Sequence, residues 1–358
     1  MSQSAGFADV DEKTAEYLCA WAPQMLSGRP EIVAITPFTD EVWRVETADG
    51  RKMVVKQQLF GFLTKYKAYD LLTVEREVLG LLHEAGCPVP EVLGVDDDRQ
   101  CIFFAWVGDD TLDDALQAGD TVLIGPAIEG LCTIERMCDR HVARLVSRVV
   151  PTAGRDELVA VWDATGERAH EGLEQLSRRL GQSRDVARAV LLLAEMHRWL
   201  AERPPSLGST DYNARNVVVD PDGTRVRFIE FAKIGWDWTE RRLVQYTTSM
   251  GSGRADGRMR SALHRDAALH YTEISGRADG ARALDGHQIF FLLNGVAMLC
   301  AALDGGPRAE ALLARWCEPA ARLRQFAVML CQALSADPVA AEFRDELRIC
   351  LTSDGDRL

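Results

Sequence analysis

The sequence predicts an α+β protein of two lobes: a small β-rich N-terminal lobe and a large helical C-terminal lobe with an inserted hairpin. Three observations predict it. Short runs rich in β-branched residues fill positions 31–107, long amphipathic helical patterns follow Thr111, and a second group of short strands interrupts the helices at 207–238. We therefore divide the 358-residue chain into an N-terminal lobe of residues 1–107 and a C-terminal lobe of residues 108–358.

The pattern of the first lobe is typical of a small antiparallel sheet that carries one helix. Glu31–Ile35 forms the first predicted strand, and a turn at residues 48–50 separates two valine-rich runs, which predicts a hairpin. Residues 69–85 place apolar side chains at helical spacing and end before Gly86, so we expect a helix there. The run CIFFAWV at 101–107 is too short for most helices and should be a strand.

The second lobe consists mostly of long amphipathic patterns, which predict helices over residues 131–149 and 186–200. The apolar stretch 289–303 falls short of the roughly 20 residues that span a bilayer, so we expect a buried helix. The segment NVVVDPDGTRVRFIEF at 216–231 has a PDG turn between two short runs and predicts a hairpin. After residue 238 the pattern predicts only helices.

Composition narrows the class of partner and the compartment. The chain has 54 acidic residues against 41 Lys and Arg, a net charge of -13, which repels phosphate backbones and anionic membranes. We therefore expect neither a nucleic acid nor a membrane partner. The N-terminus lacks the pattern of a secretory signal, and the nine cysteines show no CxxC, so reduced, mostly buried thiols in the cytoplasm are expected.

Lys56 and an acidic residue of the next helix are the first candidates for chemistry. Phosphoryl transfer needs a cation on the phosphates, a carboxylate near the acceptor hydroxyl and oxygen ligands for magnesium. Lys56 ends the third predicted strand, where a lysine is most often plain solvated surface. Glu75 in the following helix could hold it in an ion pair. Glu77 is the alternative, but it points to a different face of that helix.

The stronger signal is STDYNARN followed by the hairpin. Asp211 and Asn216 stand five residues apart just before the hairpin, and the second strand of the hairpin should deliver Glu230. In a kinase arrangement the Asp orients the acceptor proton, while the Asn and the later acid bind magnesium. An Asp with an Asn five residues later is often only a turn. Its occurrence with the hairpin, Lys56 and Glu75 in the right order favours a kinase.

These motifs resemble the aminoglycoside phosphotransferase and choline kinase family of the protein-kinase-like superfamily. That family shows a loop HGDxxxxN, a later IDF and a nearby GD or GWDD; here they are residues 209–216, Ile229-Glu230-Phe231 and Gly235-Trp236-Asp237. The similarity covers residues 31–250. It implies a kinase-like fold, ATP and Mg²⁺ as cofactors, a nucleotide-binding N-terminal lobe, and a C-terminal lobe with the catalytic loop at 207–238 and the acceptor site. The residues that it implies for nucleotide contact are Lys56, Glu75 and the hinge residues Phe104, Ala105, Trp106 and Val107.

Three departures from the family pattern stand out. Ser209-Thr210 replaces the His-Gly of the usual loop, which alters how the loop is supported. Glu230 replaces an Asp and is longer by one methylene, although magnesium demands near-octahedral geometry. The predicted turn around residues 38–42 has no glycine, so no glycine-rich loop covers the phosphates.

The favoured function is therefore ATP-dependent transfer of the γ-phosphoryl group to a hydroxyl of a small molecule. A Ser/Thr kinase acting on a peptide uses the same parts and is one alternative. A nucleotide-binding scaffold without activity is the other, and Glu230 and the missing His-Gly favour it. The net charge of -13 would suit a cationic acceptor such as an aminoglycoside or choline.

Overall fold

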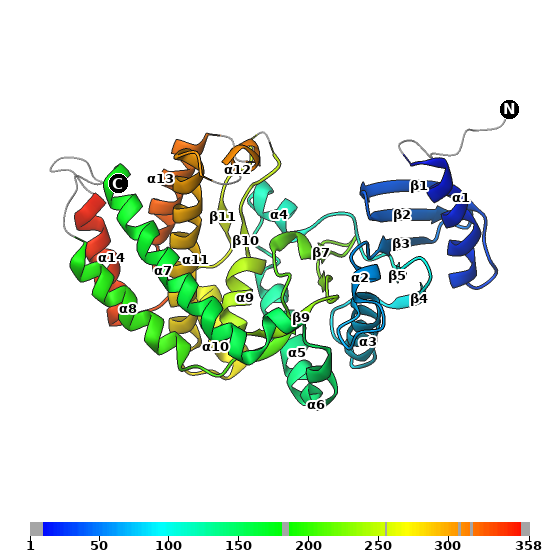
Figure 1. Ribbon diagram of the computed structural model, residues 1–358, viewed down its shortest axis with the longest axis horizontal. Coiled ribbons are helices and arrows are strands. Elements are labelled where there is room, and N and C mark those ends of the chain that lie inside the picture. Colours follow the sequence, from blue (N-terminus) through cyan, green and yellow to red (C-terminus); the bar gives the residue numbers. More distant parts are fainter. Residues whose placement is uncertain (1–9, 181–185, 255, 307–308, 316–317, 352–358) are drawn as a thin grey trace.

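The protein is an elongated molecule of two lobes in a computed structural model, with the sheet at one end and the helices at the other (Figure 1). The structure describes residues 10–180, 186–254, 256–306, 309–315 and 318–351. The predicted α+β, kinase-like division into a β-rich and a helical lobe is confirmed.

The N-terminal lobe is built on one antiparallel sheet with the strand order β1-β2-β3-β5-β4. The predicted hairpin is present, with its turn at residues 48–50. The last strand ends at Ala105, two residues before the expected end. The strands are β1 (Ile32–Thr39), β2 (Val42–Thr47), β3 (Lys52–Gln57), β4 (Val92–Asp96) and β5 (Cys101–Ala105).

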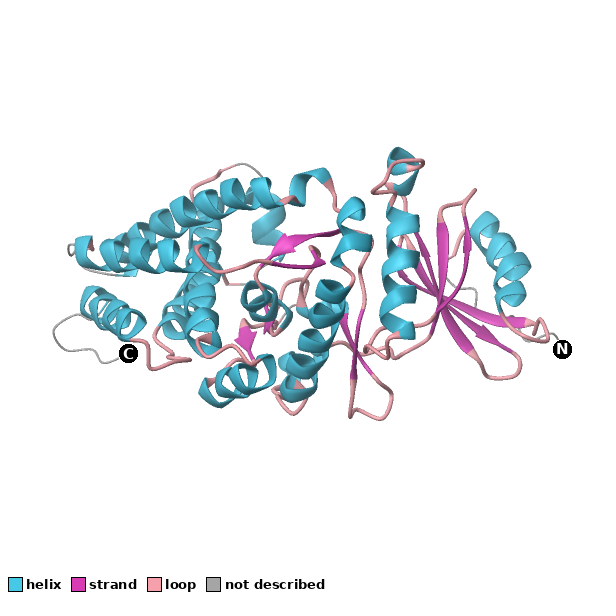
Figure 2. Ribbon diagram, turned by 90° about the horizontal axis from the view of Figure 1, so that it is seen from below, coloured by secondary structure: helices cyan, strands magenta, loops and turns pink. Residues whose placement is uncertain are grey.

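Alternation along the strands sends side chains to two different helices. The helices of this lobe are α1 (Glu12–Trp21), the short α2 (Gly61–Thr64) and α3 (Leu71–Glu84). A 3-10 turn, η1 (Ala22–Met25), directly follows α1. Met53 and Val55 pack on the α1 side, whereas Ile102 and Phe104 pack with α3. The helix expected at 69–85 is thus confirmed as α3, which stands between the sheet and the helical lobe (Figures 1 and 2).

The helical lobe is organised around one long apolar helix. Its helices are α4 (Leu112–Ala118), α5 (Ile124–Arg140), α6 (Val142–Leu145), α7 (Arg155–Leu180), α8 (Ala187–Ala201), α9 (Thr239–Tyr246), α10 (Arg265–Ser275), α11 (Gly280–Leu303), α12 (Ala309–Arg315), α13 (Pro319–Leu330) and α14 (Pro338–Leu351), with 3-10 turns η2 (Val146–Arg148), η3 (Pro151–Ala153) and η4 (Ala214–Asn216). α8 matches the helix predicted at 186–200. The helix predicted at 131–149 is instead divided, because the chain leaves α5 at His141 and restarts as α6.

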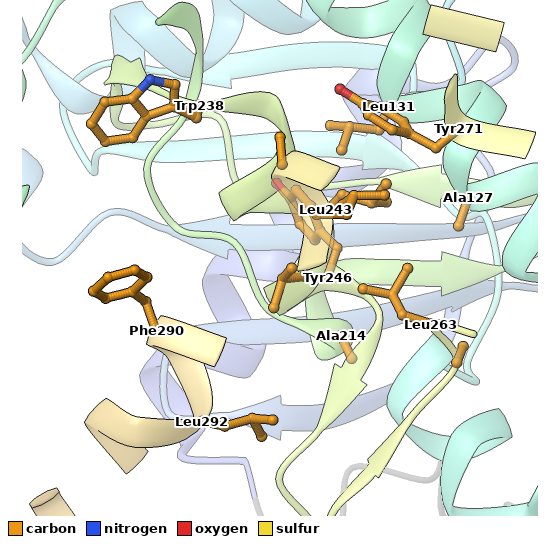
Figure 3. Packing of buried hydrophobic residues seen from close by; sticks show 14 of the residues in the cluster. Ala127, Leu131, Ala214, Trp238, Leu243, Tyr246, Leu263, Tyr271, Phe290 and Leu292 are labelled. Carbon is orange, nitrogen blue, oxygen red and sulfur yellow. The ribbon is translucent and has the colours of Figure 1, made fainter. Parts of the chain in front are cut away.

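Helix α11 contains the stretch predicted to be a buried helix, and it is the core of this lobe. Its Phe290 and Leu292 lie in the same apolar cluster as Trp238, Leu243 and Tyr246 (Figure 3). Among the described residues α11 is the one helix that is long and apolar enough to cross a membrane, and it is mostly buried inside the lobe. Its apolar composition therefore fits its place among α7, α9, α10 and α13.

Short strands interrupt the helices and carry the predicted hairpin. The hairpin is β7 (Val217–Val219) with β8 (Val226–Phe228), and a further pair is β6 (Ser206–Ser209) with β9 (Ile234–Asp237). The expectation that only helices follow residue 238 is wrong, because β10 (Thr248–Ser249) pairs with β11 (Arg260–Ser261). That pair spans only two residues per strand, too few for a periodic pattern to show.

The described cysteines fit the expected mostly buried thiols. Eight of them are described, and six of these are buried. Cys317 lies outside the described residues.

Candidate active site

A cavity of about 810 Å³ lies between the two lobes. Strands of the sheet and α3 form one wall; the start of α4, η4 and the end of the β7–β8 hairpin form the other. Most of the residues predicted for the site line it: Lys56, Glu75, Phe104, Ala105, Val107, Asn216 and Glu230. The lining does not include Asp211 or Trp106.

Lys56 is the centre of a three-residue charge cluster in this cavity. Alternation along β3 puts Lys56 on the face opposite Val55, so it points toward α3 and the cavity. Its Nζ lies 3.1 and 3.2 Å from the two carboxylate oxygens of Glu75, and 2.7 Å from Glu230 Oε2. The predicted Lys56–Glu75 ion pair is therefore present, and Glu230 is a second partner that the sequence did not suggest.

The cluster keeps its lysine charged. The side chain of Lys56 is 10% exposed and that of Glu75 only 1%. Burial by itself lowers the pKa of Lys56, but the carboxylates of Glu75 and Glu230 outweigh it and raise that pKa. Burial raises the pKa of Glu75, against the opposing effect of Lys56. An ammonium group is thus fixed at one wall of the cavity.

Glu77, kept open as the other partner for Lys56, has a different role. Its carboxylate oxygens accept bonds of 2.9 and 3.0 Å from the guanidinium of Arg148. Glu75 instead faces inward, where Gln58 also donates to it. Two positions along α3 turn the side chains to different faces, as the helical period requires.

Asp211 and Asn216 lie together at the start of the hairpin. The Asn216 amide nitrogen donates to the Asp211 backbone oxygen at 2.8 Å and to Asp211 Oδ1 at 3.2 Å. Asn213 caps the 3-10 turn η4 between them by accepting the N–H of Arg215 at 2.9 Å. The spacing of five residues therefore closes a compact loop that aligns the two side chains.

Ser209 supports this loop in place of the usual His-Gly pair. Its hydroxyl donates to the backbone oxygen of Glu230 at 2.7 Å and accepts the N–H of Asp211 at 3.1 Å. One side chain thereby joins the candidate base to the segment that carries Glu230.

Glu230 lies past the end of β8, not in the strand as the sequence suggested. The strand ends at Phe228, and Glu230 has a φ of +67°, a left-handed conformation that is uncommon for a residue with a side chain. The N–H of Ile229 donates to the backbone oxygen of Asn216 at 3.0 Å, which keeps Asn216 and Glu230 side by side.

Asn216 and Glu230 fit the needs of a magnesium ion. Both line the cavity, and because the amide nitrogen of Asn216 turns toward Asp211, its oxygen is the atom left to meet a cation. In the described part of the chain no three His, Cys, Asp or Glu side chains gather as a metal cage. Magnesium commonly takes one or two protein oxygens and completes its shell with water and substrate phosphates.

The hinge between the lobes contributes only part of its predicted surface. Phe104, Ala105 and Val107 line the cavity. The Trp106 indole instead donates to Asp109 at 3.0 Å, and its ring lies 4.6 Å from the Lys52 ammonium. The alternation of an extended chain turns this one side chain away from its neighbours.

The sequence profile of the phosphotransferase enzyme family matches residues 32–275, from β1 to the end of α10. The chain belongs to this family. The resemblance noted from the sequence is thereby confirmed, and phosphoryl transfer is the activity class. A search of the curated proteins finds no match.

Solved structures show the same fold as this phosphotransferase at low sequence identity. An aminoglycoside phosphotransferase from Alicyclobacillus acidocaldarius superposes with a TM-score of 0.53 at 13% identity, over 89% of this chain and 92% of that one. A choline kinase from Cryptosporidium parvum superposes with a TM-score of 0.52 at 9% identity, over 88% and 95%. At these identities the similarity concerns the fold.

One buried charge network of the phosphotransferase was not predicted. Arg242 of α9, 1% exposed, donates to the backbone oxygens of Ser209 at 3.0 Å, Ser206 at 3.1 Å and Gly235 at 2.9 Å. Its charge is paired with Glu135 at 2.8 Å. The guanidinium thus ties β6, β9 and the catalytic loop together. The sequence signal is weak, because the polar residues of an amphipathic helix normally face water.

Proposed function

We propose that this phosphotransferase moves the γ-phosphoryl group of ATP to a hydroxyl of a small molecule with the help of Mg²⁺. The observation that carries the proposal is the Lys56 ammonium, held by Glu75 and Glu230 in the wall of a cavity that Asn216 also lines. A fixed cation beside oxygen ligands is what a triphosphate requires.

Each side chain has a distinct proposed role. Lys56 binds the phosphates, Glu75 orients Lys56, and the hinge at 104–107 contacts the base of the nucleotide. The oxygen of the acceptor hydroxyl bonds to the γ-phosphorus, and the bond from that phosphorus to ADP breaks. Asp211 accepts the proton that the hydroxyl loses. The products are a phosphate monoester and ADP.

Asn216 and Glu230 would hold the magnesium ion, whose charge offsets the negative charge of the phosphates when it is bound. The N-terminal lobe at 1–107 would thus serve the nucleotide, and the lobe at 108–358 the acceptor. We also propose a cytoplasmic location, which the mostly buried cysteine side chains support.

Nucleotide binding can be tested by thermal unfolding with ATP, in the presence and absence of magnesium. We expect ATP with magnesium to raise the unfolding temperature more than ATP alone, because a ligand of the native state stabilises it by mass action. Asp211→Asn should keep this stabilisation and slow transfer by about 10²- to 10⁴-fold, since it removes the proton acceptor. Full transfer by Asp211→Asn would show that another group takes the proton.

A nucleotide-binding scaffold is the second candidate. The bond of Glu230 to Lys56 favours it, because a carboxylate engaged with lysine is less free for a metal. Glu230→Ala distinguishes the two. For an enzyme we expect turnover and the magnesium effect on ATP binding to disappear, with partial activity in Glu230→Asp. If magnesium has no effect in the wild type and Glu230→Ala changes nothing, the scaffold is the correct function.

A further inference from the structure

A second cavity, of about 630 Å³, lies within the helical lobe between α7, α9, α11 and α12. Its walls are largely apolar. The large apolar side chains in them are Trp162, Phe290, Phe291, Met250, Met298 and Leu312. Aromatic rings and thioethers pack against flat apolar groups, so the walls favour a ligand with an apolar or aromatic body.

The second cavity and the cavity between the lobes are lined by neighbouring residues of one segment. Met250 and Ser252 line it, whereas Gly253 and Arg254 line the cavity between the lobes, so one short segment separates the two. On the other side, Tyr212 follows Asp211 in the chain, and its hydroxyl donates to Asp237. Asp237 in turn accepts a 2.9 Å bond from Arg241, which lines the second cavity. The wall of the second cavity is therefore linked to the Asp211 loop through Arg241, Asp237 and Tyr212.

The charges of the second cavity do not suit a polycation. Two guanidinium groups, of Arg168 and Arg241, line it against the single carboxylate of Glu171. Arg241 is already paired with Asp237, so the cavity has no surplus of negative charge. A cationic ligand is bound by an excess of carboxylates, and the lining of this cavity has no such excess.

His287 adds a buried polar group to the same wall. It is 1% exposed, and within the described residues neither ring nitrogen has a hydrogen-bond partner. Burial lowers its pKa to about 3, so the imidazole is neutral. Its ring lies 5.2 Å from that of Trp162, in an edge-to-face contact. A neutral imidazole offers one hydrogen-bond donor and one acceptor but no charge, so it favours an uncharged ligand that carries a polar group over a cation.

We propose that the second cavity binds the body of the acceptor, and that the acceptor is an apolar, typically aromatic, alcohol rather than a polycation. The inference rests on the proposed function and replaces the expectation of a cationic acceptor that the net charge had suggested. The alcohol oxygen forms the new bond to the γ-phosphorus of ATP, its proton passes to Asp211, and ADP leaves with the bonding electrons of the broken bond.

The test uses the full chain and a series of naphthyl alcohols in which the methylene spacer between ring and hydroxyl is lengthened stepwise. Calorimetry measures binding, and mass spectrometry detects the naphthyl phosphate formed with ATP and magnesium. The variants Phe291→Glu and Met298→Glu place a carboxylate in the cavity; Met298 is 43% exposed, so its substitution leaves the core intact. Leu191→Glu is the matched control on α8, outside the cavity and 62% exposed.

We expect at least one alcohol of the series to bind and to be phosphorylated. Phe291→Glu should weaken binding by about tenfold or more, because a carboxylate is costly to bury against an aromatic ring. Met298→Glu should weaken it less, because this position is partly exposed, and Leu191→Glu should leave it unchanged. The proposal is overturned if no naphthyl alcohol binds, if the cavity variants bind as well as the control, or if binding yields no phosphate ester while ATP with magnesium still binds. Phosphorylation of choline or an aminoglycoside that neither variant impairs would also overturn it.

Thermal stabilisation by ATP and magnesium is measured on every variant in parallel. Its absence in the wild type would contradict the proposed function itself. Because alcohol binding is measured without ATP, the two failures are distinguishable.

Discussion

Lys56 illustrates how burial and charge are balanced at a single residue. A buried ammonium is unfavourable unless carboxylates compensate it, and two of them do so within hydrogen-bond distance. The arrangement has a further consequence, since Glu75 itself is almost completely buried and depends on Lys56 for its charge. Removing either partner therefore changes stability as well as binding.

Lys56→Met should lower the free energy of unfolding by about 3–5 kcal/mol, because the buried Glu75 loses its cation. It should also abolish binding of ATP with magnesium. The double variant Lys56→Met/Glu75→Gln should recover most of the stability without recovering binding, since the carboxylate no longer needs a partner. Urea unfolding and calorimetry measure the two quantities. If the double variant bound ATP as the wild type does, Lys56 would not contact the phosphates.

The Lys56–Glu75 pair could be predicted because it depends on short-range periodicity. A strand end and an inward helix position are both visible in the sequence. The contact of Glu230 with Lys56 could not be predicted, because it depends on a left-handed backbone conformation after β8 that no local sequence pattern requires. The side chain of Trp106 escaped prediction for a similar reason, because its partner Asp109 is fixed by the course of the hinge.

His287 should make the folded protein sensitive to acid. Its pKa in the folded state is about 3, below its ordinary value of 6.5, so the unfolded chain binds the proton first as pH falls. Stability contributed by the neutral imidazole is therefore lost progressively from about pH 6.5 downward, by up to about 1.4 kcal/mol per pH unit. Between pH 6.5 and 5 the wild type should lose about 2 kcal/mol more than His287→Phe.

Urea unfolding of both proteins at the two pH values measures this difference. The charged neighbours of His287, which are Asp237, Arg241 and Arg203, are present in both proteins and cancel. Equal pH dependence in the two proteins would mean that the histidine takes up its proton as readily in the folded protein as in the unfolded chain.

At the scale of elements, α9 positions the catalytic loop through Arg242. One planar guanidinium bonds three backbone oxygens and Glu135 at once, which a lysine ammonium cannot do with the same geometry. α9 thus connects the β6–β9 pair to the loop of Asp211. The helix serves as a support for the site although it contributes none of the predicted site residues.

Arg242→Lys should keep the charge opposite Glu135 but release the backbone of Ser209. We expect kcat to fall about 10- to 100-fold, because small displacements of a reacting group are costly. Since Lys56 and the hinge are untouched, binding of ATP should stay within about twofold of the wild type. Arg188→Lys, which changes a surface pair with Glu342, is the control. Equal losses of kcat and ATP affinity would indicate general destabilisation instead of positioning.

The elements differ in how far the sequence revealed them. α11 was predictable, since its apolar run needs no partner to be recognised. β6 and β9 were not, because each has four residues and the pair forms across an intervening segment of the chain. The end of α5 at His141 was missed as well, because no glycine or proline marks it. Local sequence patterns thus predict long elements such as α11, whereas tertiary contacts determine where the short strands form.

At the scale of the whole molecule, the hinge is fastened to the hairpin that carries the site. The N–H of Val219 donates to the backbone oxygen of Asp110 at 2.8 Å, and Thr111 forms a bridge with Val218. Gly108 has a φ of +150°, and a Cβ at this position would overlap the backbone oxygen of Val219. These contacts therefore fix the position of the hinge relative to the hairpin that carries the site.

Gly108→Ala should disturb this relation and weaken binding of ATP with magnesium. Gly223→Ala is a matched control in the turn of the same hairpin, with a φ of +68° and no heavy atom within 4 Å of its added Cβ. The control should lose only about 1–2 kcal/mol of unfolding free energy, the cost of a left-handed alanine. Gly108→Ala adds the overlap with Val219, so it should lose more stability and, unlike the control, bind ATP at least about tenfold more weakly. Urea unfolding and calorimetry on both variants measure this, and equal ATP affinity in the two would show that the contact of the hinge with the hairpin does not shape the nucleotide site.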